Sequence, residues 1–168
     1  AAAMAQDTTP APSDSATKAC KTEKAQMGAP TFKAAYGTNK TKSNAFGKCV
    51  SKRTTTETAN QDNAAKQCKA ERAADAAAFN AKYGTNKNDK NAYGKCVSSK
   101  SKAATAADTK TDVSAAKSCK TERSGDPAAF KAKYGTNKTK SNAFGKCVSA
   151  TAKAKPDETT TTTTTTSS

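Results

Sequence analysis

Six cysteines are the residues of this chain whose type and spacing define a chemistry most clearly. Paired thiols form disulfides or ligate a metal, but the chain has no histidine, and two thiolates alone make a poor zinc site. Six cysteines allow 15 pairings, of which the one that repeats along the chain is favoured. We therefore predict three disulfides, which join Cys20 with Cys49, Cys68 with Cys96 and Cys119 with Cys147.

Other residues that could act in catalysis are scarce. There is no histidine base, no Gly-rich phosphate loop and no Ser-centred elbow. One glutamate follows the first cysteine of each pair by three positions, and a basic residue comes next: Glu23-Lys24, Glu71-Arg72 and Glu122-Arg123. This arrangement favours a local salt bridge or helix pairing over an acid–base dyad. We predict a protein without enzymatic activity, metal or cofactor.

The elements that hold the cysteines are three copies of one unit. The stretch 36–51 reads YGTNKTKSNAFGKCVS, 134–149 is identical, and 83–98 differs from both at few positions. Tandem copies indicate arrays, multivalent binding or polymers. The predicted division is an N-terminal Ala/Thr/Pro-rich segment (1–17), repeat 1 (18–51), a linker (52–65), repeat 2 (66–98), a linker (99–116), repeat 3 (117–149) and a Thr-rich tail (150–168).

The composition makes the disulfides necessary for folding. The chain contains no Leu, Ile or Trp, and its 34% hydrophobic residues are mostly alanine. A unit this small rarely folds on its core alone. A disulfide that closes a loop of roughly 30 residues contributes about 3–4 kcal/mol on the chain-entropy model. Disulfides also indicate a location outside the reducing cytosol, and Ala3-Met4-Ala5 resembles the end of a signal peptide, so we expect a secreted protein.

Each repeat is predicted to be helical. Phe and Tyr lie four positions apart, on one helix face, and the glycine after each Tyr is expected to end that helix in a left-handed conformation. The spacing before the Phe predicts a break, except in repeat 2, where 73–78 could continue straight. A third helix is expected to start after Thr41, Asn88 or Thr139. The predicted fold is all-α: three tandem small disulfide-stapled helical units joined by Thr/Ala-rich linkers.

The linkers and tail are rich in Thr, Ser, Ala and Pro, and they lack aromatic residues. Such tracts in secreted proteins are candidates for O-glycosylation, and an unmodified disordered tail is the alternative. Asn39 and Asn137 match the weaker N-glycosylation pattern. The predicted O-glycosylation sites are Thr159, Thr160, Thr161, Thr162, Thr163, Thr164, Thr165 and Thr166.

Positive charge is concentrated in the repeats. The formal net charge is +15, and 29 basic residues include arginine at only three positions, 53, 72 and 123. A cationic surface attracts anionic polymers, but base-edge recognition favours arginine, so sequence-specific nucleic-acid binding is not expected. A lysine-rich surface that only maintains solubility is the alternative.

The pattern C-K-x-E-[RK], A-x-Y-G-T-N-K and N-A-[FY]-G-K-C-V-S resembles an uncharacterised cysteine-paired repeat of secreted proteins from high-GC Gram-positive bacteria. The resemblance covers the three repeats and not the linkers. It implies export and the same cysteine pairing, and it implies no particular activity.

Two functions follow from the sequence. The first is a structural subunit of an extracellular filament or surface assembly, whose partner is a second copy of itself. The alternative is a multivalent lysine-rich binder of glycans or anionic polymers at the cell envelope. No apolar run of transmembrane length occurs in the sequence.

Overall fold

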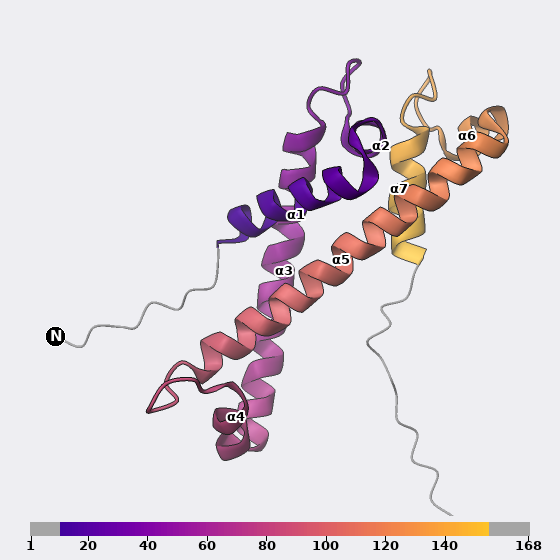
Figure 1. The fold of residues 1–168 in the computed structure, drawn as a ribbon. Coiled ribbons are helices and arrows are strands. Elements are labelled where there is room, and N and C mark those ends of the chain that lie inside the picture. The colour runs from indigo at the N-terminus through magenta and orange to yellow at the C-terminus, as the bar shows by residue number, and fades with distance from the viewer. Residues whose placement is uncertain (1–10, 155–168) are drawn as a thin grey trace, which may run out of the picture.

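A computed structural model describes residues 11–154, and all regular secondary structure in this range is α-helical (Figure 1). The all-α prediction is confirmed for these residues. The helices are α1 (Pro12–Met27), α2 (Ala29–Tyr36), α3 (Ala45–Ala74), α4 (Ala76–Tyr83), α5 (Ala92–Gly125), α6 (Pro127–Tyr134) and α7 (Ala143–Ala154).

Within each repeat, a break separates the cysteine-bearing helix from the short aromatic helix. Gly28 makes this break in repeat 1 with a positive φ of 78°, which a residue with a side chain rarely adopts. The expectation of a straight helix through 73–78 is wrong. Asp75 ends α3, and its carboxylate accepts a hydrogen bond of 2.9 Å from the amide of Ala78 as the N-cap of α4.

The two segments that we predicted to be linkers are helical. Residues 52–65 lie inside α3 and residues 99–116 lie inside α5, so each long helix runs from one repeat into the next. Threonine hydroxyls in α3 bond to the carbonyl four residues earlier, as Thr54 does to Val50 at 2.9 Å, which satisfies these polar groups within the helix. A continuous helix fixes the distance and the rotation between consecutive repeats.

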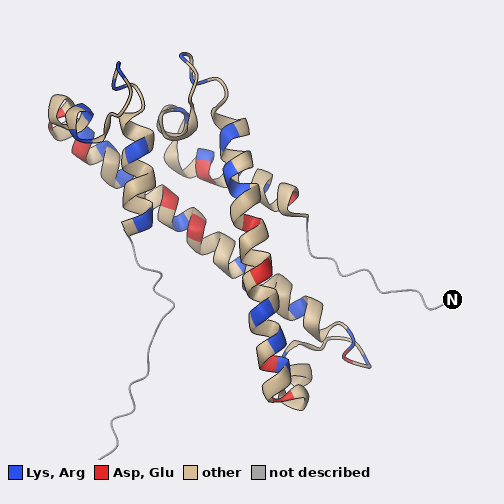
Figure 2. Cartoon of the chain, turned by 180° about the vertical axis from the view of Figure 1, so that it is seen from behind, with Lys and Arg blue, Asp and Glu red and all other residues tan. Residues whose placement is uncertain are grey.

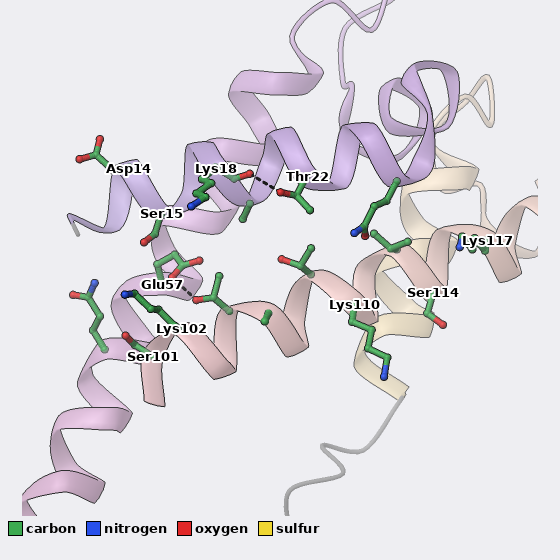
Figure 3. Close-up of a pocket in the computed structure, with 17 residues that line it drawn as sticks. Asp14, Ser15, Lys18, Thr22, Glu57, Ser101, Lys102, Lys110, Ser114 and Lys117 are labelled. Carbon is green, nitrogen blue, oxygen red and sulfur yellow. Dashed lines mark hydrogen bonds between the residues drawn. The ribbon is translucent and has the colours of Figure 1, made fainter. Parts of the chain in front are cut away.

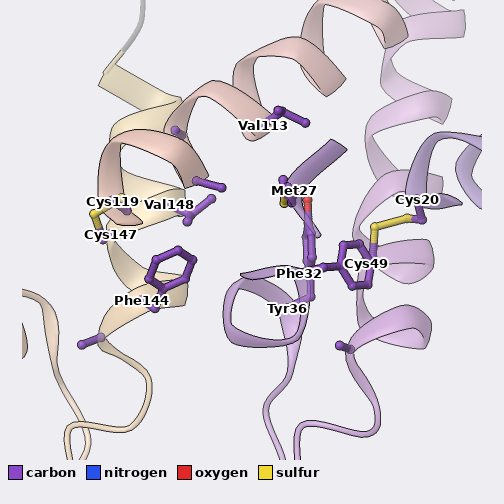
Figure 4. Close-up of a cluster of buried hydrophobic side chains, with 14 of the residues drawn as sticks. Cys20, Met27, Phe32, Tyr36, Cys49, Val113, Cys119, Phe144, Cys147 and Val148 are labelled. Atoms are coloured by element: carbon purple, nitrogen blue, oxygen red, sulfur yellow. A yellow bond between two sulfur atoms is a disulfide. The ribbon is translucent and has the colours of Figure 1, made fainter. Parts of the chain in front are cut away.

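The long helices α3 and α5 cross, and their crossing brings repeats 1 and 3 together (Figures 1 and 4). One apolar cluster extends over both of these repeats and includes Phe32, Val113, Phe144 and both of their disulfides. Repeat 2 lies at the other end of the crossed helices and has a separate, smaller cluster: Cys68, Phe79, Ala92 and Cys96.

The close contact between repeats 1 and 3 depends on one position at which the repeats differ in sequence. A Cβ atom at Gly145 of α7 would lie 2.8 Å from the carbonyl oxygen of Ala35, so α2 and α7 approach closely there. Repeats 2 and 3 carry Lys82 and Lys133 where repeat 1 carries Ala35. The small residue in repeat 1 therefore leaves room for the backbone of α7.

This contact predicts opposite effects for the same substitution at two equivalent glycines. Gly145→Ala is expected to destabilise the fold by about 1–3 kcal/mol, because the new methyl group overlaps the α2 backbone. Gly47→Ala, at the equivalent helical position of repeat 1, has nothing within 4 Å of the new Cβ and is expected to stabilise by about 0.5–1 kcal/mol. Urea unfolding of both variants measures the difference. Equal effects at both glycines would contradict the described packing.

Candidate functional site

The six cysteines form the pairs that the sequence predicts. Cys20 bonds to Cys49, Cys68 to Cys96 and Cys119 to Cys147, each with a Cα–Cα distance of 6.0 Å. Each bond links the helix before the aromatic helix to the helix that starts after the loop. The sulfurs are buried, so these cysteines hold the repeats together.

The recurrent glutamate pairs with the tyrosine of its own repeat. The Tyr83 hydroxyl donates to Glu71 at 2.9 Å, Tyr134 donates to Glu122 at 3.0 Å, and Tyr36 donates to Glu23. Among the described residues, no ion pair joins these glutamates to the basic residue that follows each of them in the sequence. In repeats 2 and 3 the ion-pair partners of the glutamate are instead lysines from other helices, including Lys100 at 2.7 Å from Glu71 and Lys133 at 2.8 Å from Glu122.

A repeated loop follows each aromatic helix: loop 1 (37–44), loop 2 (84–91) and loop 3 (135–142). An asparagine at its end closes loop 1, because the Asn44 side chain accepts from the Thr38 amide at 3.0 Å and donates to the Thr38 hydroxyl at 2.8 Å. Loops 2 and 3 have the same two bonds through their own Asn and Thr. The third helix starts after this asparagine and not after Thr41, Asn88 or Thr139, which lie inside the loops.

The glycine at the start of each loop is needed for space. The left-handed conformation that we expected there is not observed, since φ is −70° at Gly37, −67° at Gly84 and −74° at Gly135. A Cβ at Gly37 would lie 2.7 Å from the Lys33 carbonyl oxygen and 2.6 Å from the Lys42 Cβ. The left-handed residue is Lys42 itself, with φ of 57°, and its ammonium group donates back to the Gly37 carbonyl at 2.7 Å.

Loops 1 and 3 lie side by side at one end of the molecule, and the Lys42 ammonium group donates to the Ser141 carbonyl at 3.5 Å (Figures 1 and 2). Together with the first turn of the helices that follow, the two loops form what we call the lysine tip. It contains no acidic residue and six lysines: Lys40, Lys42, Lys48, Lys138, Lys140 and Lys146. Loop 2, at the opposite end, contains Asp89 among its lysines.

The candidate N-glycosylation residues lie on exposed loops. Asn39 donates from its side-chain amide to Ser43 at 2.8 Å, and Asn137 makes the equivalent bond to Ser141 at 2.9 Å. The predicted O-glycosylation sites Thr159–Thr166 lie outside the described residues.

A buried ion cluster joins repeat 1 to residues 52–65 of α3 and 99–116 of α5, the two segments that we predicted to be linkers. Arg53 of α3 is 2% exposed, and its guanidinium bonds to Glu23 of α1, with Nε to Oε1 at 2.6 Å, and to Asp112 of α5 at 2.9 Å. Tyr36 donates to both carboxylates, and the half-exposed Lys52 pairs with Asp112 at 3.0 Å. The cluster fixes three helices from distant parts of the chain relative to one another.

Burial has opposing effects on the groups of this cluster. Loss of water raises the pKa of Glu23 above its usual value, although the Arg53 charge and the Tyr36 hydrogen bond act in the opposite direction. Burial lowers the pKa of Arg53, but the neighbouring Glu23 and Asp112 carboxylates raise it by more, so Arg53 stays protonated. Burial and the same carboxylates raise the pKa of Tyr36, which therefore stays neutral and donates its proton.

A groove of about 940 Å³ lies between α1 and α5, and α3 contributes Glu57 and Gln61 to its lining (Figure 3). We call it the α1/α5 groove. Ala19, Ala106 and Val113 line it, together with several serines and threonines. The carboxyl of Glu57 also lines it, accepts a hydrogen bond from Thr105 through one oxygen, and is buried with no hydrogen-bond partner for Oε1. The sequence analysis did not identify this groove, because its residues come from three segments far apart in the chain.

Glu57 predicts a stability difference that depends on pH. Burial raises the folded-state pKa of Glu57 above 4.5, so the wild-type carboxyl stabilises the fold fully below about pH 4.5 and loses that contribution as pH rises through the folded-state pKa. Glu57→Gln has no charge to bury, so we expect it to be more stable than the wild type at pH 7.5, by on the order of 1 kcal/mol, and not at pH 4. Urea unfolding at both pH values tests this. Asp62→Asn, at an exposed position of α3, is the control, and an equal effect of Glu57→Gln at both pH values would contradict the prediction.

The chain matches no protein family, no curated protein and no solved structure. The resemblance to a bacterial cysteine-paired repeat therefore stays a prediction. Among residues 11–154, no group of three or more His, Cys, Asp or Glu side chains could hold a metal ion. None of the helices described is both long and apolar enough to cross a membrane. The three disulfides are compatible with an extracellular protein.

Proposed function

We propose that this chain is a secreted, non-enzymatic structural protein, the subunit of an extracellular filament or surface assembly. The observation that carries the proposal is the continuity of α3 and α5, which join the three stapled repeats into one frame. Flexible linkers would let the repeats move independently, whereas continuous helices hold them at fixed spacing. A part with fixed geometry can repeat regularly in an assembly, where each copy must present the same surfaces to its neighbours.

The proposal includes glycosylation of the threonine tail. Its support is compositional, since Thr159–Thr166 lie outside the described residues. In α3 the threonines bond to helix carbonyls, so sugars there would compete with these hydrogen bonds. We therefore place the expected sugars on the tail and not on residues 52–65.

Electron microscopy of the non-reduced protein from its native source tests the assembly, and the intact mass of the same sample tests the sugars. We expect regular filaments or sheets and a mass per chain above 17.3 kDa. Gly145→Ala and Gly47→Ala chains are imaged in the same way as a matched pair. Only the first substitution changes the contact between repeats 1 and 3. Single particles of the wild-type chain over a range of concentrations would overturn the structural proposal, and a mass equal to that of the bare chain would overturn glycosylation.

Binding of anionic polymers is a second candidate function, and the lysine tip favours it. Loops 1 and 3 are held together and present six lysines without a carboxylate, so their positive potentials add over one surface. The structure changes how such binding would work. Loops 1 and 3 are held in fixed positions on one rigid body. Such binding therefore does not require three independent sites joined by flexible linkers.

A matched pair of double variants tests this second function. Lys40→Gln/Lys138→Gln removes two exposed charges from the lysine tip, and Lys69→Gln/Lys95→Gln removes two exposed charges from repeat 2. With inorganic polyphosphate as the probe, we expect the first variant to bind several-fold more weakly and to show a smaller salt dependence than the second. Equal losses in the two variants would mean that only net charge matters and would overturn a specific role for the tip.

A further inference from the structure

The α1/α5 groove combines an apolar floor with basic side chains on its two long walls. Lys18 of α1 and Lys102 of α5 lie on facing helices at the end of the groove where Glu57 is located (Figure 3). Lys110 and Lys117 line it further along α5. All four lysines are exposed.

These lysines have no carboxylate to neutralise them. Within residues 11–154, none of the four forms an ion pair, whereas Lys52, Lys82, Lys100 and Lys133 all do. The exposed carboxylate that lines the groove belongs to Asp14, and Figure 3 shows it directed away from α5. Glu57 is buried, and one of its carboxyl oxygens accepts a hydrogen bond from Thr105 of α5.

The floor of the groove is formed by small side chains. Ala19, Thr22, Ala106 and Thr109 occupy facing positions of α1 and α5, and the lysine stems add further apolar surface above them. The volume of about 940 Å³ lies within the range of roughly 300–1,000 Å³ that small-molecule sites occupy. The space is elongated along the two helices, which suits a linear apolar chain.

We propose that the α1/α5 groove binds a monomeric single-chain anionic amphiphile, such as a fatty carboxylate. The apolar chain lies along the floor between Ala19 and Ala106. The anionic head lies between Lys18 and Lys102, whose charges complement it. The groove is distinct from the lysine tip and from loop 2, because no residue of either lines it.

The experiment uses the full-length oxidised chain labelled with ¹⁵N, titrated with decanoate below its micelle concentration and followed by amide NMR. We expect saturable shifts confined to α1, the middle of α3 and α5. Decyltrimethylammonium has the same chain length and the opposite charge, and acetate has the same head without the chain, so both are expected to bind at least about tenfold more weakly. Absence of saturable decanoate binding, or equal binding of decyltrimethylammonium, would overturn the proposal.

Two pairs of variants locate the site. Ala106→Leu fills the groove floor without a change in charge, and Ala103→Leu adds the same side chain at an exposed position of α5 that does not line the groove. Lys18→Gln/Lys102→Gln removes the head-group contacts, with Lys69→Gln/Lys95→Gln as its charge-matched control. We expect the first member of each pair to weaken decanoate binding about tenfold relative to its control. Equal affinities within both pairs would place binding elsewhere and would overturn the assignment.

Discussion

Replacement of both Cys68 and Cys96 by alanine is expected to unfold repeat 2 while repeats 1 and 3 keep their shared core. The apolar cluster of repeat 2 consists of these two cysteines, Phe79 and Ala92, with partly buried side chains packed against it. Loss of the disulfide removes about 3–4 kcal/mol on the chain-entropy model, and so small a cluster has little to replace it. Hydrogen exchange of the α4 amides measures the effect directly, and we expect their protection to be lost.

The matched control is the Cys20→Ala/Cys49→Ala variant. Its repeat stays packed against repeat 3 through the joint cluster and against α5 through the buried ion cluster. We therefore expect a lower midpoint of unfolding but continued protection of α2. If α2 and α4 lose protection equally in their respective variants, the repeats depend on their disulfides alone, and the packing of repeats 1 and 3 contributes little.

The second large effect is expected at Arg53. Arg53→Met leaves Glu23 and Asp112 buried near each other without their common cation, which typically costs about 3–5 kcal/mol. The loss is expected to diminish at acidic pH, because protonation of Glu23 removes the carboxylate charge that is left without a cation, whereas Asp112 keeps its ion pair with Lys52. Urea unfolding at pH 4 and pH 7.5 measures both the loss and its pH dependence.

A triple variant separates the ion pairs from the packing. Arg53→Met combined with Glu23→Gln and Asp112→Asn removes all three charges with little change in volume, and we expect it to recover most of the lost stability. Arg72→Met, at an exposed position of the same helix, is the control for the substitution itself. A loss that stays the same in the triple variant would mean that Arg53 acts through its packing and not through its charge.

The sequence predicts the parts of the fold that depend on local pattern or on recurrence. Three equivalent copies identify the cysteine pairs, and the Phe–Tyr spacing identifies the aromatic helices, whose rings pack at 4.9–5.0 Å between centroids. The helical character of 52–65 and 99–116 was missed. Threonine and charged residues there indicate a solvated connector, and only the folded chain shows that Arg53 and Asp112, far apart in sequence, neutralise each other inside.

The candidate site also contains features that the sequence predicts and features that it does not. The position of the recurrent glutamate is visible in sequence, but its partner is the tyrosine on the next helix, which a neighbour rule along one helix does not find. The loop glycines are recognisable as required, but for the wrong reason, because the crowding comes from the side chain five residues later, Lys42, Asp89 or Lys140, and from the carbonyl four residues earlier. The α1/α5 groove had no sequence pattern at all, since its residues come from α1, α3 and α5, which are far apart in the sequence.

The number of residues between consecutive disulfides on α3 and α5, which we call the spacer length, sets the distance and the rotation between repeats. Cys96 and Cys119 on α5 are further apart than Cys49 and Cys68 on α3, and the excess is about one helical turn. A whole turn changes the distance between two stapled units by about 5–6 Å while it nearly restores the direction in which each unit faces. A single inserted residue would instead rotate one unit against the next by about 100°. Changes of spacer length in whole turns therefore lengthen or shorten the frame, and all other changes alter the directions in which its ends point.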